Sequence, residues 1–142
     1  MRTGVYFAGD KSCVAAVAAA ISGVVQQATT PLPPPYMPEK LPVLFLGTCS
    51  VGKKPHKEAV TFAELLTSQR TKNVALFCTN PKASDAPLQP LKSILETKGI
   101  HIVDTFVCHG KGGFFSKDPS DEELQAACAF AERVLAESET NA

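Results

Sequence analysis

The chain has 142 residues, of which 14 are Lys or Arg and 14 are Asp or Glu, so its formal net charge is zero. That length fits a single domain covering residues 1–142. The balanced charge argues against a general nucleic-acid binder, which needs a basic excess to neutralise phosphates. Five cysteines without a Cys-x-x-Cys pair are not the disulfide framework of a secreted protein, so we expect a cytoplasmic location.

The Ala-rich apolar stretch over residues 13–25 is the one candidate for a targeting segment, with the pattern of a signal-peptide core as one interpretation. Against it, the strand-like run Val5-Tyr6-Phe7-Ala8 stands where a short basic region is needed. The turn residues Gly9-Asp10-Lys11 then separate the two runs. The stretch is also shorter than the ~20 apolar residues that span a bilayer. We therefore expect no membrane association.

Short apolar runs alternate with helical patterns along the chain. The predicted strands cover 5–8, 42–47, 73–78 and 100–108, and the predicted helices cover 12–27, 57–68 and 120–136. A further helix is predicted where Leu88, Leu91, Ile94 and Leu95 repeat at helical spacing, with Lys98-Gly99 as its stop. The last helix begins with a predicted capping box, Ser120-Asp121-Glu122-Glu123. Near-continuous apolar strands indicate burial on both faces, as in a parallel sheet covered by helices. Together with the alternation of strand and helix, they predict an α/β fold, a three-layer doubly wound parallel sheet.

One segment interrupts this alternation. Residues 29–42 hold six of the eleven prolines, including Pro33-Pro34-Pro35. Because proline has no backbone donor, the segment cannot be a central strand. It is predicted to be a polyproline-like connector or at most a poor edge strand, with a motif that binds another protein as the alternative.

Ligands of open parallel sheets bind outside the carboxyl ends of the strands. The loops predicted at that edge hold Lys11, Lys53, Lys54, Lys57, Lys82, Lys111 and Lys117, against the acids Asp10, Asp85 and Asp118. A basic edge beside a helix N-terminus favours an anion such as a phosphate. The alternative is that these lysines are ordinary solvated surface.

Four cysteines also fall at or just past strand ends on this edge, with two histidines near them: Cys13, Cys49, Cys78, Cys108, His56 and His109. Zinc binding or thiol redox chemistry would use such a group, but no pair has ligand spacing, so we expect no metal. Cys78 and Cys108 should pack as small hydrophobes, and Cys128 should lie in the core. Cys13 and Cys49 are the thiols expected to be exposed.

No nucleophile constellation is visible. The sequence contains neither a G-x-S-x-G elbow nor a G-x-x-x-x-G-K-[ST] loop. We therefore predict no catalytic residues, and favour a binding module over an enzyme with catalytic residues of its own.

The apolar runs and the loops that follow them form a recognisable series. In chain order they are Val5-Tyr6-Phe7-Ala8, Val43-Leu44-Phe45-Leu46-Gly47-Thr48, Gly52-Lys53-Lys54-Pro55, Val74-Ala75-Leu76-Phe77-Cys78-Thr79-Asn80 and Ile102-Val103-Asp104-Thr105-Phe106-Val107-Cys108 with Gly110-Lys111-Gly112. The series resembles the flavodoxin family over residues 5–135. The resemblance implies strand order 2-1-3-4-5, with the second strand short or missing in the Pro-rich segment. It also implies FMN at the carboxyl edge and redox partner proteins.

Two features depart from the family pattern. Where the family has a phosphate loop of the type S/T-x-T-G-N-T, this chain has Lys11-Ser12-Cys13-Val14. The loops over 48–57 and 79–87 contain no Phe, Tyr or Trp to stack on a flavin. By this resemblance His56 could take that place, or Phe114 and Phe115 could reach over.

The resemblance implies ten cofactor-binding residues: Asp10, Lys11, Ser12, Cys13, Thr48, Cys49, Ser50, Gly52, Thr79 and Asn80. Lys11, Ser12 and Cys13 would hold the FMN phosphate, and the residues from Thr48 onward would surround the ring. The basic edge should make a bound flavin easier to reduce. One alternative is a flavin-free module for another anionic ligand or a protein partner. Another is a thiol-based redox or metal protein that uses Cys49 or Cys13.

Overall fold

The structure is a computed structural model that describes residues 3–9, 13–110 and 119–140. Its elements follow in the order β1 (Thr3–Ala8), α1 (Cys13–Val25), β2 (Thr29–Pro31), β3 (Val43–Val51), β4 (Lys54–Pro55), α2 (Lys57–Leu65), β5 (Asn73–Asn80), α3 (Leu88–Thr97), β6 (His101–His109) and α4 (Asp121–Thr140). All predicted strands and helices are therefore present.

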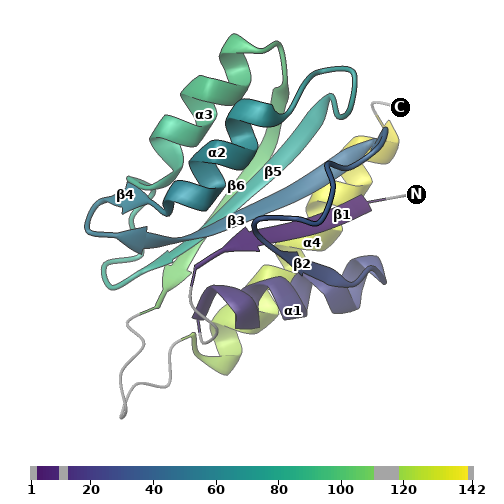
Figure 1. The fold of residues 1–142 in the computed structure, drawn as a ribbon. Helices are drawn as coiled ribbons and strands as arrows, with labels where there is room; N and C mark the ends of the chain where they lie inside the picture. The colour runs from purple at the N-terminus through teal and green to yellow at the C-terminus, as the bar shows by residue number, and fades with distance from the viewer. Residues whose placement is uncertain (1–2, 10–12, 111–118, 141–142) are drawn as a thin grey trace.

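The main sheet has the order β2-β1-β3-β5-β6, and every pair along it is parallel. The short strand β4 lies off this path and pairs antiparallel with β3. Without β4, the order is the predicted 2-1-3-4-5. Figure 1 shows α2 and α3 on one face of the sheet and α1 and α4 on the other. The predicted three-layer doubly wound architecture is confirmed.

Two apolar clusters fill the space between the sheet and its helices. On the α1–α4 side, Phe130 meets Phe45 edge-on at 5.8 Å between ring centroids and stacks on Phe106 at 5.4 Å. On the α2–α3 side, Tyr6 stacks on Phe62 at 4.9 Å. The central strands β3 and β5 supply side chains to both clusters. This double burial explains why their sequences are near-continuous apolar runs.

The Pro-rich segment begins as the edge strand β2, in which Thr29, Thr30 and Pro31 pair with β1. The pairing stops early because Pro31 has no N–H and prolines follow it. Residues 32–40 are neither helix nor strand. The prediction of a poor edge strand is confirmed, and the second strand of the order is short rather than missing.

Several predicted boundaries are wrong. Strand β3 continues to Val51, and residues 50–55, predicted as loop, form a hairpin with β4. Its turn is Gly52-Lys53, with φ of +67° at Gly52, as expected of a tight hairpin turn that begins with glycine. Helix α2 ends at Leu65 because Leu66 is extended, with ψ of 149°. Helix α1 ends before Gln26, whose φ is +58°.

Strand β6 contains a bulge. Val74 pairs with Ile102 but Ala75 pairs with Asp104, which leaves Val103 as an extra residue. Before the bulge, Ile102 packs on the α2–α3 side. After it, Asp104 accepts a hydrogen bond at 3.3 Å from Arg133 of α4, on the opposite side. The extra residue thus resets which face each side chain of β6 occupies.

Among the helices of the described residues, none combines the length and the apolar character needed to cross a membrane.

Candidate functional site

The carboxyl ends of β1, β3, β5 and β6 meet at one edge of the sheet, as the sequence predicts. Three of the ten predicted cofactor-binding residues, Asp10, Lys11 and Ser12, lie outside the described residues, as do Phe114 and Phe115. The other seven lie at this edge: Cys13, Thr48, Cys49, Ser50, Gly52, Thr79 and Asn80.

Thr48 is buried at this edge and its hydroxyl is already engaged. Its Oγ1 donates to the carbonyl of Cys49 at 2.7 Å and accepts from the backbone N–H of His56 at 2.9 Å. His56 in turn caps α2, because its Nδ1 accepts from the backbone N–H of Glu58 at 3.1 Å. The side chains of Thr48 and His56 therefore hold the start of α2 in place.

The side chain of Asn80, 5% exposed, shapes the loop that follows β5. Its Oδ1 accepts from the backbone N–H groups of Lys82 at 3.2 Å and Ser84 at 3.0 Å. Its Nδ2 donates to the carbonyl of Ser84 at 2.7 Å and to the sulfur of Cys78 at 3.7 Å. These contacts fold residues 80–84 into a compact turn, so the amide serves the loop itself.

Thr79 lies on the other side of the same strand end, where the backbone packs closely. A Cβ placed on Gly110 would lie 2.5 Å from the Cβ of Thr79 and 2.9 Å from the Cβ of Cys13. Only glycine fits at this approach. The Oγ1 of Thr79 is buried, and no hydrogen-bond partner is found for it. Such a hydroxyl is costly unless another group satisfies it.

A cavity of about 440 Å³ opens between the β3–β4 hairpin and the loop after β5. Gly52 and Asn80 are the two predicted site residues that line it. Lys53, Pro81, Lys82 and Ser84 also line it. The sequence indicates the two lysines only as part of the basic edge. It gives no reason to select Pro81 and Ser84, whose place depends on the turn that Asn80 builds.

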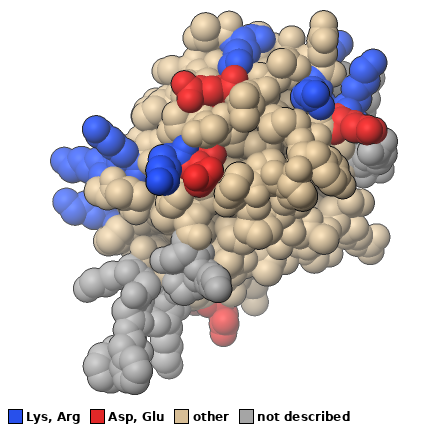
Figure 2. Space-filling view, in the orientation of Figure 1, with Lys and Arg blue, Asp and Glu red and all other residues tan. Residues whose placement is uncertain are grey.

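The cavity is positively charged. Lys53 and Lys82 line it, and the neighbouring Lys54 is exposed. In Figure 2, Lys and Arg side chains gather at the left of the molecule, where Figure 1 places β4. The acid Asp85 is exposed shortly before α3 and does not line the cavity. The predicted basic edge is therefore present in its described part.

The prediction that Cys13 is an exposed thiol is wrong. Cys13 is 2% exposed because it begins α1 against the sheet and Gly110 covers it. Cys49 is half-buried, and Cys128, predicted in the core, is also only half-buried. Cys78 and Cys108 are buried, as predicted. No group of three potential metal ligands occurs within residues 3–9, 13–110 and 119–140.

Burial raises the pKa of the Cys78 thiol to about 12. The hydrogen bond from Asn80 acts in the opposite direction, and the nearby charge of Asp85 adds to the increase. A thiol with such a pKa stays protonated at neutral pH and is a poor nucleophile. The structure therefore gives Cys78 a packing role at the base of the site.

Glu123 connects the end of β6 to the start of α4. Its Oε2 accepts from the backbone N–H of His109 at 2.8 Å and lies 3.0 Å from the Nδ1 of the same residue. Its Oε1 accepts from the backbone N–H of Ser120 at 3.2 Å, and the hydroxyl of Ser120 accepts from the N–H of Glu123. The predicted capping box is thus confirmed. Burial acts to raise the pKa of Glu123, but these hydrogen bonds and the charge of His109 lower it overall.

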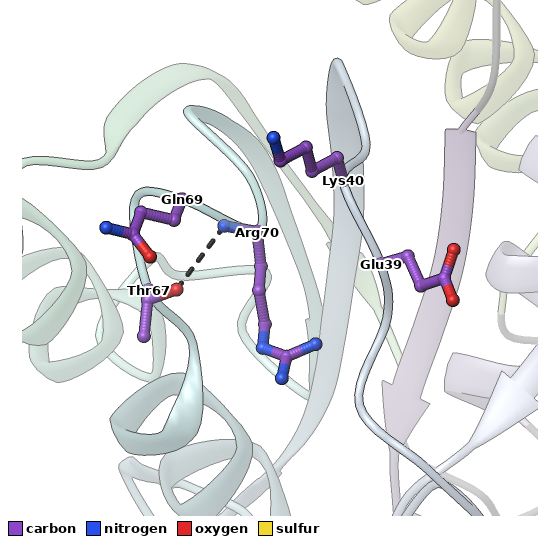
Figure 3. A pocket seen from close by; sticks show the side chains of 5 residues that line it. All are labelled: Glu39, Lys40, Thr67, Gln69 and Arg70. Atoms are coloured by element: carbon purple, nitrogen blue, oxygen red, sulfur yellow. Dashed lines mark hydrogen bonds between the residues drawn. The ribbon is translucent and has the colours of Figure 1, made fainter.

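A larger hollow, of about 690 Å³, lies at the opposite, amino edge of the sheet. Figure 3 shows the residues that line it: Glu39, Lys40, Thr67, Gln69 and Arg70. All five are exposed. This hollow is therefore a surface depression without buried polar groups among its lining residues, and the smaller carboxyl-edge cavity is the better candidate for a ligand.

No protein-family model matches the chain, and no curated protein matches it in sequence. Solved structures do match. A flavodoxin from the domain Archaea superposes with a TM-score of 0.76 at 14% identity, covering 97% of this chain and 99% of that one. Oxidised flavodoxin 1 from Bacillus cereus gives 0.71 at 16% identity, over 95% and 97%. A WrbA-like flavodoxin from Agrobacterium tumefaciens gives 0.67 at 12% identity, over 97% of both. The chain therefore has a flavodoxin-like fold.

Proposed function

We propose that this flavodoxin-like chain binds FMN at its carboxyl edge and carries electrons between redox partner proteins in the cytoplasm. The observation that carries the proposal is the cavity of about 440 Å³ between the β3–β4 hairpin and the loop after β5. Its volume lies in the range of small-molecule sites, roughly 300–1,000 Å³. Its position, outside the carboxyl ends of neighbouring parallel strands, is where such sheets bind ligands.

The described residues are compatible with an anionic flavin. Lys53 and Lys82 put positive charge on the cavity wall. Lys11, Ser12 and Cys13 would hold the phosphate, beside the N-terminus of α1, where backbone N–H groups and the helix dipole favour negative charge.

FMN, when bound, would supply the electron-transfer chemistry, and the chain would position and tune it. Lys53 and Lys82 would stabilise the negative charge that a ring gains on reduction. A site with this lining should therefore make the flavin easier to reduce than a site surrounded by carboxylates.

The test is a titration of FMN with the purified protein, followed by flavin fluorescence. We expect saturable quenching, and about tenfold weaker binding for the double variant Lys53→Ala, Lys82→Ala. Lys72→Ala is the matched control, because Lys72 is exposed at the amino edge. Riboflavin, which lacks the phosphate, should bind more weakly than FMN. A colourless protein that leaves FMN fluorescence unchanged at high concentration would rule the proposal out.

A second candidate is a flavin-free module that binds another anion at the same edge. The cavity lining favours it, since the described lining residues include no Phe, Tyr or Trp to stack on a flavin. Inorganic phosphate or pyrophosphate, followed by NMR chemical shifts, separates the two. Shifts at Lys53 and Lys82 that saturate with the anion, together with no FMN binding, would favour this candidate.

A further inference from the structure

The Pro-rich segment contains a feature that neither the fold nor the proposed cofactor site uses. Its central residues read Pro33-Pro34-Pro35-Tyr36. Tyr36 is 77% exposed, more than either of the other exposed large hydrophobic side chains, Val51 and Leu65. Pro33 and Pro35 are exposed as well, and Pro34 is half-buried. A connector between β2 and β3 needs no exposed tyrosine, so this row of apolar rings requires another explanation.

The segment is fixed to the body of the protein on both sides of these four residues. On one side, the N–H of Leu32 donates to the carbonyl of Phe7 at 2.8 Å. On the other, the carbonyl of Pro38 accepts from the Nη1 of Arg70 at 2.8 Å, and Met37 packs on the α2–α3 cluster. Figure 3 shows Arg70 beside the chain that leads into β3. Residues 33–36 are thus held outward between two anchored ends.

We infer that residues 33–36 are a docking site for a WW domain of a partner protein. Two consecutive prolines, one further residue and a tyrosine make up the Pro-Pro-x-Tyr pattern that fits the aromatic-lined groove of such a domain. Proline rings offer flat apolar faces and no N–H that would lose its hydration. Tyr36 adds a large aromatic anchor with a hydroxyl that can hydrogen-bond at the rim of the groove.

The fold also selects against the other common reader of proline-rich chains. SH3 domains bind Pro-x-x-Pro, and the segment contains this spacing at Pro31 with Pro34 and at Pro35 with Pro38. Pro31 pairs with Phe7 in the sheet, and Pro38 is buried. One proline of each pair is therefore engaged within the protein. The docking site also shares no residue with the carboxyl-edge cavity, so it stands independently of FMN binding.

The test is calorimetric titration of the intact chain with a purified WW domain of the class that binds Pro-Pro-x-Tyr peptides. We expect saturable one-to-one binding. Tyr36→Ala should weaken it roughly thirtyfold, as for loss of a central aromatic anchor, and Pro34→Ala about tenfold. The matched controls are Leu65→Ala, an exposed apolar side chain on α2, and Pro90→Ala, an exposed proline on α3. Both should bind like the unmodified chain.

A synthetic peptide of residues 29–40 and an SH3 domain that binds Pro-x-x-Pro peptides complete the experiment. Binding of the WW domain to the peptide but not to the intact chain would overturn the inference, because the fold would then hide the motif. It would also be overturned by equal binding of Tyr36→Ala, or by binding of the SH3 domain in place of the WW domain. Circular dichroism of each variant confirms that the fold is retained.

Discussion

At the residue scale, Glu123 is the side chain that ties the end of β6 to α4, through its contacts with His109 and Ser120. Its pKa is lowered in the folded protein, although burial alone would raise it. A carboxyl with a lowered folded pKa stabilises the protein above its ordinary pKa. That contribution is lost as the pH falls through the ordinary value and then the folded value.

We therefore predict that Glu123→Ala lowers the free energy of unfolding by about 1 kcal/mol at pH 7, the usual effect of losing a helix cap. The variant should also lose less stability than the unmodified chain on going to mildly acidic pH. Urea denaturation at both pH values measures this. Glu122→Ala, an exposed neighbour on the same helix, is the control. An equal loss of stability with acid in both variants would contradict the prediction.

Cys78 gives a prediction at alkaline pH. Its pKa is about 12 in the folded chain, against an ordinary value of 9.0, and burial is the main cause. Above pH 9 the Cys78 thiol therefore ionises in the unfolded chain but stays protonated in the folded chain. This difference favours unfolding. The free energy of unfolding should fall by on the order of 2 kcal/mol between about pH 8.5 and about pH 10.5 on this account. Cys78→Ala should remove that part of the pH dependence, as measured by urea denaturation. An unchanged slope in the variant would show that other groups cause it.

The family resemblance, not the residue types, selects the candidate site residues. Two of them, Gly52 and Asn80, line the cavity. The sequence cannot show that the hydroxyl of Thr48 accepts a hydrogen bond from the backbone of His56. Nor can it show that the amide of Asn80 is hydrogen-bonded within its own loop. Those partners are set by the path of the backbone after each strand. The burial of Cys13 likewise depends on Gly110, which is distant in the chain.

At the element scale, the β3–β4 hairpin forms one wall of the cavity, and its turn depends on Gly52. The φ of +67° at Gly52 is strained for any side chain, and a Cβ there would meet nothing within 4 Å. Gly99, after α3, has the same properties with φ of +78°. The two glycines thus form a matched pair that differ in their distance from the site.

We predict that Gly52→Ala and Gly99→Ala each lower the free energy of unfolding by about 1 kcal/mol. Only Gly52→Ala should also weaken FMN binding, because only Gly52 lines the cavity. Chemical denaturation and the fluorescence titration measure the two effects. If both variants bind FMN like the unmodified chain, the hairpin turn is not part of the site.

The elements themselves were largely predictable because each strand buried on two faces leaves a continuous apolar run, and each helix leaves an apolar stripe. The hairpin was not predictable, since residues 50–55 carry no alternating apolar pattern. Strand β2 was only partly predictable. Its three residues pair because β1 lies beside them, against the preference of the prolines that follow.

At the scale of the whole molecule, one sheet separates two apolar layers, and β3 and β5 belong to both. A loss of packing in one layer should therefore also destabilise the other layer, so that both unfold together. Phe130 lies in the α1–α4 layer, and Tyr6, stacked on Phe62, lies in the α2–α3 layer.

We predict that Phe130→Ala lowers the free energy of unfolding by about 3–5 kcal/mol, the usual cost of removing a buried phenyl ring. Helical circular dichroism and tyrosine fluorescence, to which Tyr6 contributes, should report one common transition at the lower stability. Phe62→Ala provides the reciprocal experiment from the other layer. Separate transitions from the two probes would mean that the layers unfold independently.

The bulge in β6 has a consequence for encounters between molecules. Of the described strands, β2 and β6 are the outer ones. An outer strand with a regular row of unpaired N–H and C=O groups can pair with a strand of another chain. At β6 the extra residue Val103 bends and twists the strand. At β2 the strand is three residues long and ends in a proline. Each border is thus short or interrupted over part of its length, which disfavours growth into edge-to-edge aggregates despite the strongly apolar central strands.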